Sequence, residues 1–280
     1  MNIYISADIE GITGTISWNQ CGRADGQHYD FPFSRRMMTH DVNAAVKGAR
    51  AAGADRIVIK DSHGNSKSLL VDELEPGVEL ISGLGSGVQG MMEGIDSSFD
   101  AALLIGYHAM AGTEAGIMEH TITGGIHRLT INGEPAGEIA LSVAAAGVHG
   151  VPVVAVSSDA NGCAEVSALI PHVKTAVVKH GLGRYMGRLL HPSTTGKLIE
   201  EAAKSGVSGL KSAKTWLPAQ PVSIGIEFNR SEEADYCAKL LGAARSGAYG
   251  VSVTYPTFPE AHQALWDLVG LSFAGQTAGN

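Results

Sequence analysis

Short, continuous apolar runs recur along this chain and constrain its fold more than any other feature. Examples are IVI at 57–59, ALLI at 102–105 and VPVVAV at 151–156. Strands that are apolar on both sides are typical of parallel sheets with helices on both faces. Helix-like segments alternate with these runs for most of the length. The sequence therefore predicts an α/β fold of three layers with a largely parallel central sheet.

The same patterns place nine strands and six helices along the chain. The expected strands span 2–7, 56–60, 78–82, 101–106, 127–131, 152–157, 173–178, 222–227 and 251–255. The expected helices span 37–52, 137–146, 161–169, 193–205, 231–241 and 260–269. Composition shifts after about residue 215, where Pro218 and Pro221 bracket a connector. We therefore expect an α/β domain over 1–215 and a smaller C-terminal lobe over 216–280.

Charge and cysteine usage exclude several classes of partner and of site. The formal net charge is −8 without a block of Lys and Arg, so neither nucleic acid nor an anionic membrane is an expected partner. No apolar run reaches the roughly 18 residues of a membrane span, and we see no signal-peptide pattern. Cys21, Cys163 and Cys237 are widely spaced and form no CxxC motif. Reduced thiols and a cytoplasmic location are therefore expected.

The first predicted strand ends in a pair of acids. Asp8 and Glu10 have only Ile9 between them, and residues two apart on an extended chain point to the same side. Two carboxylates placed in this way repel each other and lose solvation unless a positive charge lies between them. Gly11 follows, and we expect it to let the chain turn away beneath the acids. The pair therefore calls for a nearby cation.

Further carboxylate and imidazole groups follow later strands. His63 lies in DSHG, His108 in GYHA, His120 in EHT, and Glu138 in the first turn of a helix after an Asn-Gly hairpin at 132–133. Because ligands gather beyond the carboxyl ends of parallel strands, we expect these side chains at one edge of the sheet. Taken singly, each has a structural explanation, as a solvated acid, a turn or core histidine, or an acid that complements a helix dipole.

Taken together, these residues favour a metal site. Carboxylate and imidazole ligands suit Zn²⁺ and related divalent ions. Three carboxylates and two histidines are enough for two ions if one carboxylate bridges them, and bridging would relieve the repulsion between Asp8 and Glu10. Two ions roughly 3.5–4 Å apart activate a water and polarise a carbonyl or phosphoryl oxygen. His120 would then be available to move a proton or to stabilise an oxyanion.

At these residues the chain resembles the M55 family of metallopeptidases, the D-aminopeptidases. The blocks that carry the resemblance occur in the family's order and at comparable separations from residue 1 to about 230. They are SADIEGITG at 6–14, DSHG at 61–64, GYHA at 106–109, EHT at 119–121 and NGEPAGE at 132–138. The resemblance implies two zinc ions. It places one on Asp8, Glu10 and His63 and the other on Asp8, His108 and Glu138, with Asp8 bridging and His120 catalytic.

The resemblance also implies a reaction and an assembly. Members of the family hydrolyse short peptides from a free N-terminus and favour D-residues such as D-Ala. Their subunits form stacked rings with the active sites facing an inner chamber, so a decamer-like homo-oligomer is expected. Two positions depart from the family's pattern, because Glu119 precedes the catalytic histidine and Lys60 precedes DSHG. These departures bear on substrate preference, and neither removes an expected ligand.

Three other functions would use parts of the same sequence. A two-metal amidase or phosphoesterase would use the same ligands, and a phosphate substrate would need cations for which Lys60 and Arg128 are the nearest candidates. The glycine-rich stretch SGLGSGVQG at 82–90 resembles a phosphate cradle, but the chain has neither a P-loop nor the expected acid at the end of the next strand. A serine nucleophile at Ser62 is excluded as a partner of His63, because adjacent residues on an extended chain point apart.

Overall fold

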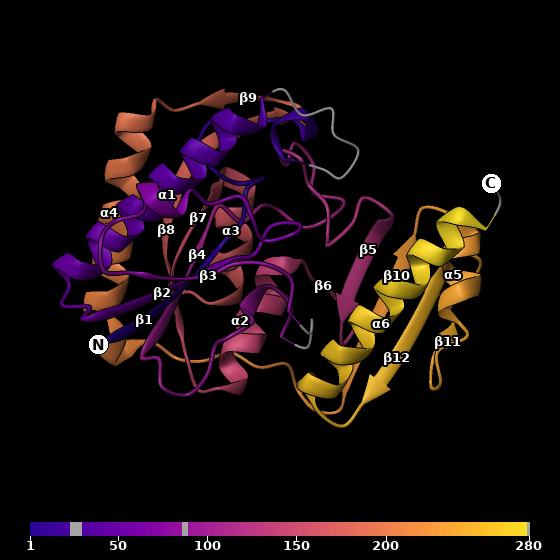
Figure 1. Ribbon diagram of the computed structural model, residues 1–280. Coiled ribbons are helices and arrows are strands. Elements are labelled where there is room, and N and C mark those ends of the chain that lie inside the picture. The colour runs from indigo at the N-terminus through magenta and orange to yellow at the C-terminus, as the bar shows by residue number, and fades with distance from the viewer. Residues whose placement is uncertain (23–29, 86–88, 279–280) are drawn as a thin grey trace.

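A sheet of seven strands forms the centre of the computed structural model, which describes residues 1–22, 30–85 and 89–278 (Figure 1). The strand order is β3-β2-β1-β4-β7-β8-β9. All neighbouring pairs are parallel except β8 with the edge strand β9. The strands are β1 (Asn2–Ala7), β2 (Arg56–Asp61), β3 (Glu79–Ile81), β4 (Ala101–Ile105), β7 (Val153–Asp159), β8 (Lys174–Gly183) and β9 (Met186–Leu189). The predicted α/β fold with a largely parallel sheet is confirmed.

Helices cover both faces of this sheet and enclose two separate cores. The helices α1 (Phe31–Ala51) and α4 (Pro192–Ser208) pack on one face, where Ile3 and Ile5 of β1 are buried. The helices α2 (Glu138–Val148) and α3 (Ala160–Leu169) pack on the other face, where Tyr4 is buried. The alternation of Ile3, Tyr4 and Ile5 between two cores explains why β1 reads as a continuous apolar run.

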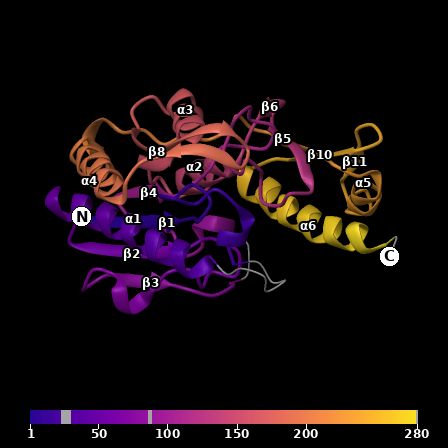
Figure 2. The same ribbon diagram turned by 90° about the horizontal axis from the view of Figure 1, so that it is seen from above.

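A second sheet lies beside the first (Figure 2). Its strands, in spatial order, are β11 (Ala244–Arg245), β12 (Gly250–Tyr255), β10 (Val222–Phe228), β5 (Ile126–Ile131) and β6 (Glu134–Pro135). All of its neighbouring pairs are antiparallel, and the helices α5 (Ser231–Cys237) and α6 (Phe258–Thr277) pack against it. Four 3₁₀ turns among the described residues span Trp18–Gln20, Val71–Glu73, Gly90–Met92 and Leu210–Ser212.

The second sheet draws on two separated stretches of the chain. The hairpin of β5 and β6 comes from 126–135 and pairs with β10, which begins at Val222. Asn132 joins the two stretches, because its side chain accepts from the Ser223 N–H and donates to the Ala219 carbonyl, both at 2.8 Å. The division of the chain at residue 215 stays a prediction. A lobe built around this sheet would also include the hairpin.

The helix α6 is longer than the predicted 260–269. It begins with a capping box in which Thr257 and Glu260 satisfy each other's backbone N–H, and it continues to Thr277 with Ser272 and Gly275 buried. The apolar pattern did not predict this continuation, because small and polar residues occupy its buried side. Within the described ranges, no helix combines the length and the apolar character needed to cross a membrane.

Protonation of His262 on α6 is expected to weaken the fold in acid. The imidazole is 5% exposed, stacks on Phe258 and accepts a hydrogen bond from Trp266 Nε1 at 3.2 Å. Burial lowers the pKa of His262 from 6.5 to about 4. Between these values the unfolded chain binds the proton and the folded chain does not, so stability falls as the pH drops from 6.5 to 4. The contribution of this group is at most about 3 kcal/mol.

The variant His262→Gln keeps an acceptor for Trp266 and removes the titrating group. Urea unfolding at pH 7 and at pH 4.5 should give a smaller difference in the free energy of unfolding for His262→Gln than for the native chain. Identical pH dependence in the two proteins would contradict this prediction.

Candidate metal centre

The candidate site lies where the strand order of the central sheet reverses. From β1 the chain proceeds to β2 and β3 on one side, and β4 then adds on the other side. Such switch points in open α/β sheets leave a crevice beyond the carboxyl ends of the strands. Asp8 follows β1, His63 follows β2 and His108 follows β4. The order of the strands therefore brings together three residues that are far apart in sequence.

Close backbone approach holds two of these loops together. The Gly11 N–H donates to the Gly106 carbonyl at 2.7 Å, and a Cβ on Gly11 would lie 1.7 Å from the Tyr107 carbonyl oxygen. Gly106 itself has φ +74°, which favours glycine. Gly11 is therefore required by contact with the neighbouring loop, which is a different reason from the turn predicted from the sequence. Any larger residue would push the loops of Asp8 and His108 apart.

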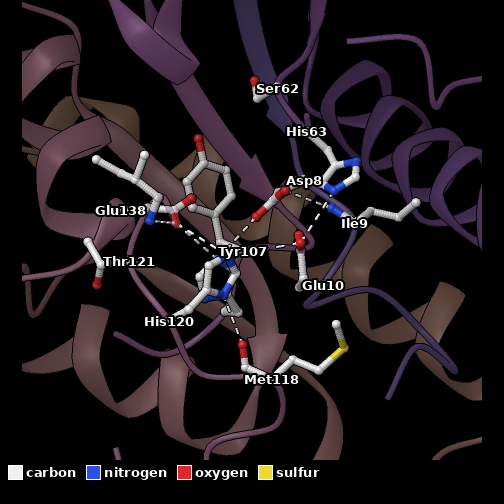
Figure 3. A network of polar contacts seen from close by, with 12 residues as sticks. Asp8, Ile9, Glu10, Ser62, His63, Tyr107, Met118, His120, Thr121 and Glu138 are labelled. Atoms are coloured by element: carbon white, nitrogen blue, oxygen red, sulfur yellow. Dashed lines mark hydrogen bonds and ion pairs between the residues drawn. The ribbon is translucent and has the colours of Figure 1, made fainter. Parts of the chain in front are cut away.

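Carboxylate and imidazole groups converge in this crevice (Figure 3). His63 Nε2 lies 3.3 Å from Glu10 Oε1. His108 Nε2 lies 3.5 Å from Asp8 Oδ2 and 3.3 Å from Glu138 Oε1. His120 Nε2 faces the same acids, at 4.0 Å from Glu10 Oε1 and 3.8 Å from Glu138 Oε1. The six predicted site residues thus form one cluster, with His63 partly exposed and the others buried; they are Asp8, Glu10, His63, His108, His120 and Glu138.

Hydrogen bonds at Nδ1 orient all three imidazoles with Nε2 toward the acids. His108 Nδ1 lies 3.0 Å from the Ala109 carbonyl and His120 Nδ1 lies 2.9 Å from the Met118 carbonyl, so both Nδ1 atoms carry the hydrogen. His63 Nδ1 contacts Ser68 Oγ at 3.3 Å. Nε2 is therefore the nitrogen through which each of these two rings can bind a metal or a proton.

His120 is held on two further sides. Its ring stacks on the His108 ring with centroids 4.0 Å apart, and the edge of Trp18 approaches it at 4.9 Å. Burial and the neighbouring His108 lower the pKa of His120 to about 4. Near neutral pH this ring is a rigidly placed, neutral base.

The charges of the acids depend strongly on one another. Burial and the neighbouring Glu10 raise the pKa of Asp8 well above its usual range. Burial alone would also raise the pKa of Glu10, but His63, His120 and His108 outweigh it and hold that pKa well below its usual range. The pKa of His108 is raised well above 6.5, because attraction by Glu138, Asp8 and Glu10 outweighs its burial. The cluster therefore favours added positive charge.

The donor atoms fit a divalent metal ion such as Zn²⁺. Among the described residues, Asp8 Oδ2 and His108 Nε2 are buried polar atoms without a hydrogen-bond partner, and they lie 3.5 Å apart. Unpaired buried polar atoms are costly, and shared coordination would satisfy both. Two groups of three residues offer ligand atoms within 4.8 Å of one another, namely Asp8, Glu10 and His108, and His108, His120 and Glu138. His120 thus stands near enough to be a ligand as well as a catalytic group.

Lys179 on β8 holds the backbone of the loop that carries Glu10. Its ammonium is fully buried and donates to the carbonyls of Glu10 at 2.5 Å and of Thr15 at 2.6 Å. Burial lowers the pKa of Lys179 to about 8. The two bonds fix both ends of the loop that follows β1, and so they fix the backbone of Glu10. No motif around this residue pointed to such a role in the sequence.

A cavity of about 1000 Å³ opens from the acids toward the second sheet. Its walls include several side chains that the sequence analysis missed, and these come from the 3₁₀ turn after β1, the start of α5 and the helix α6. They are Trp18, Asn229, Arg230, Trp266, Phe273 and Gln276. Their positions at turns and on an amphipathic helix are equally typical of structural residues, so no local signal distinguishes them.

Lys60, Arg128 and Glu119 do not line this cavity. Lys60 Nζ is bound to Ser66 Oγ at 2.8 Å and to the Gly83 carbonyl at 3.3 Å, and neither Lys60 nor Arg128 lines the cavity. Glu119 accepts from the Gly112 N–H and pairs with Arg184 at 3.3 Å. The cations expected for a phosphate substrate are therefore not at the site. The glycine-rich stretch 82–90 falls partly outside the described residues, at 86–88.

The known proteins that this chain resembles are D-aminopeptidases. A family model described as Peptidase M55, D-aminopeptidase, matches residues 1–266. A D-aminopeptidase of Bacillus subtilis (strain 168) is 32% identical over 266 residues, which are 95% of this chain and 95% of the relative. A solved structure, described as the Zn-dependent D-aminopeptidase DppA from Bacillus subtilis, a self-compartmentalizing protease, matches with a TM-score of 0.92. It is 31% identical, and the match covers 98% of each chain.

Proposed function

This chain belongs to the Peptidase M55 family of D-aminopeptidases, and we propose that it is a zinc-dependent aminopeptidase that removes D-residues such as D-Ala from the free N-terminus of short peptides. The family that the sequence motifs resemble is confirmed. The observation that carries the proposal is the convergence of three imidazole Nε2 atoms on three buried carboxylates. Within the described part of the chain, Asp8 Oδ2 and His108 Nε2 have no hydrogen-bond partner.

Two zinc ions are proposed for this site. One would be held by Asp8, Glu10 and His63, which is supported by the 3.3 Å between His63 Nε2 and Glu10 Oε1. The other would be held by Asp8, His108 and Glu138, which is supported by the position of His108 Nε2 near both acids. When bound, such ions polarise the scissile carbonyl and lower the pKa of water. Asp8 would bridge the two sets.

His120 is assigned to proton transfer. Its Nε2 lone pair faces the acids, and its Nδ1–H is already committed to the Met118 carbonyl. At Nε2 it can take a proton from the attacking water and return it to the departing amine. The stack on His108 and the edge contact with Trp18 limit the ring to this orientation.

A homo-oligomer is also proposed. The related DppA structure is described as a self-compartmentalizing protease, and the β8–β9 hairpin carries exposed apolar side chains at Leu182, Met186 and Leu189 that a second copy could cover. Stacked rings of a decamer-like assembly would keep folded proteins from the site. We further propose a cytoplasmic location, in which the three buried cysteines stay reduced thiols.

Removal of the metal should abolish the activity. The zinc-loaded chain is expected to hydrolyse D-Ala-p-nitroanilide and to leave p-nitrophenyl phosphate intact, because Lys60 and Arg128, the cations expected for a phosphate substrate, do not line the cavity. Dialysis against a chelator should lower the rate at least about 100-fold, and zinc should restore it. The melting temperature should fall in parallel, since binding stabilises the folded state. Metal analysis should find about two zinc ions per active chain.

Two results would contradict this. Full activity in a chain with almost no metal would rule out a metallopeptidase. Hydrolysis of the phosphate ester in preference to the anilide would favour the two-metal phosphoesterase, the alternative that the ligands alone leave open.

A further inference from the structure

The cavity is lined by groups of both charges. The carboxylates of Asp8, Glu10 and Glu138 line it, and so does Arg230, just before α5. Among the described residues that line the cavity, Arg230 is the one Lys or Arg. The acids come from the central sheet and α2, whereas Arg230 follows β10 of the second sheet. One cavity therefore joins the proposed metal ligands of the central sheet to an arginine that follows the second sheet.

The backbone that carries Arg230 is firmly held. The Asn229 N–H donates to the Gly125 carbonyl at 2.8 Å, and Asn229 Nδ2 donates to the Gly124 carbonyl at 2.7 Å. The Arg230 N–H donates to Glu233 Oε2 at 3.3 Å, and Glu233 is fully buried, where Gln276 Nε2 donates to its other oxygen at 2.5 Å. The start of α5 is thus tied both to the loop beside the acids and to α6.

The guanidinium of Arg230 keeps donors free for a ligand. Its ion-pair partner within the described residues is Glu232, at 3.7 Å, and the two side chains are 55% and 43% exposed. Exposed pairs of this kind contribute only about 0–1 kcal/mol. A guanidinium has five N–H donors in a planar fork that matches the two oxygens of a carboxylate. A substrate carboxylate that binds the guanidinium through both oxygens can therefore displace Glu232.

From this arrangement we infer that Arg230 binds the C-terminal carboxylate of a short peptide whose N-terminal residue lies at the candidate metal centre. The inference rests on the proposed function and narrows it to short peptides with a free carboxylate at the far end. A peptide with a free amine and a free carboxylate matches the acids and the arginine that line this cavity. The cavity volume of about 1000 Å³ is at the upper end of the range of about 300–1000 Å³ that is typical of pockets for small ligands. The cavity can therefore accommodate a peptide of a few residues. A peptide that ends in a neutral amide loses this contact.

The test compares a D-alanyl tripeptide with its C-terminal amide on the zinc-loaded chain. Arg230→Gln should raise KM for the free acid roughly 10–100-fold, the loss expected for charge-assisted hydrogen bonds, and leave kcat within about twofold. KM for the amide should stay within about twofold of the native value, because the amide has no carboxylate to bind the guanidinium. Arg230→Lys should restore part of the preference. Arg128→Gln serves as the matched control, because Arg128 is an exposed arginine of β5 that does not line the cavity.

A binding measurement separates this inference from the proposed reaction. Calorimetry with His120→Ala protein measures the affinity for the acid and the amide without turnover. Tighter binding of the acid, lost when Arg230→Gln is added, supports the contact even if neither peptide is hydrolysed by the native chain. Equal binding of acid and amide by the His120→Ala protein overturns it. An equal effect of Arg230→Gln on both peptides also overturns it, since that marks a general structural role.

Discussion

The variant Asp8→Ala should lose at least about a thousandfold in kcat/KM, because it removes the one carboxylate proposed to serve both metal ions. Asp8 is 2% exposed, and its Oδ2 faces His108 Nε2. Without this oxygen the two halves of the cluster share no ligand, and Glu10 and Glu138 remain buried with less compensating charge. We expect the bound zinc to fall well below that of the native chain.

Zinc content and peptidase activity should be measured on the same preparation. Asp55→Ala is a suitable control, because Asp55 is largely exposed and pairs with the N-terminal amine far from the acids. Retention of full zinc content by Asp8→Ala, with kcat/KM within about tenfold of native, would remove Asp8 from the proposed centre.

The variant His120→Ala should show a different pattern, with kcat lower by about 10²–10⁴-fold and the zinc content preserved. The imidazole faces the acids through Nε2 without approaching closer than 3.8 Å, whereas His63 and His108 each reach an acid at 3.3 Å. Loss of a proton carrier slows the reaction and leaves the proposed ligands in place. Glu119→Gln is the adjacent control, because Glu119 pairs with Arg184 outside the cavity.

A loss of zinc in His120→Ala would falsify the assignment of this residue as a catalytic group that is not a ligand. His108, His120 and Glu138 already offer three donor atoms within 4.8 Å of one another. In that event His120 would replace a member of the second ligand set, and another group would have to move the proton.

The apolar patterns predicted most of the central sheet because they report burial directly. β1 spans the predicted 2–7, and β4 covers 101–105 of the predicted 101–106. The parallel arrangement then predicted where the strands end, and with them the neighbourhood of Asp8, His63 and His108. The strands β9 and β11 are not predicted by these patterns, because they are short edge strands without continuous apolar runs.

Local sequence patterns do not encode which strands pair when they lie far apart in the chain. The hairpin at 126–135 was expected from Asn-Gly, yet nothing near it indicates that β5 pairs with β10 about 90 residues later. Local patterns also do not predict where side chains point. Lys60 and Glu119 lie next to site residues in the sequence, but Lys60 binds Ser66 and Glu119 pairs with Arg184. Lys179 and Arg230 looked like ordinary charges, and burial or cavity position alone distinguishes them.

The lining of the cavity has a consequence for directed evolution. The residues proposed to carry the reaction come from the ends of β1, β2 and β4 and from α2, whereas other lining residues come from the start of α5 and from α6. A mutant library confined to Arg230, Trp266, Phe273 and Gln276 would alter the lining of the cavity without touching the proposed donor atoms. Selectivity and turnover can therefore be optimised in separate rounds, and the M55 scaffold offers a starting point for enzymes that trim synthetic D-peptides.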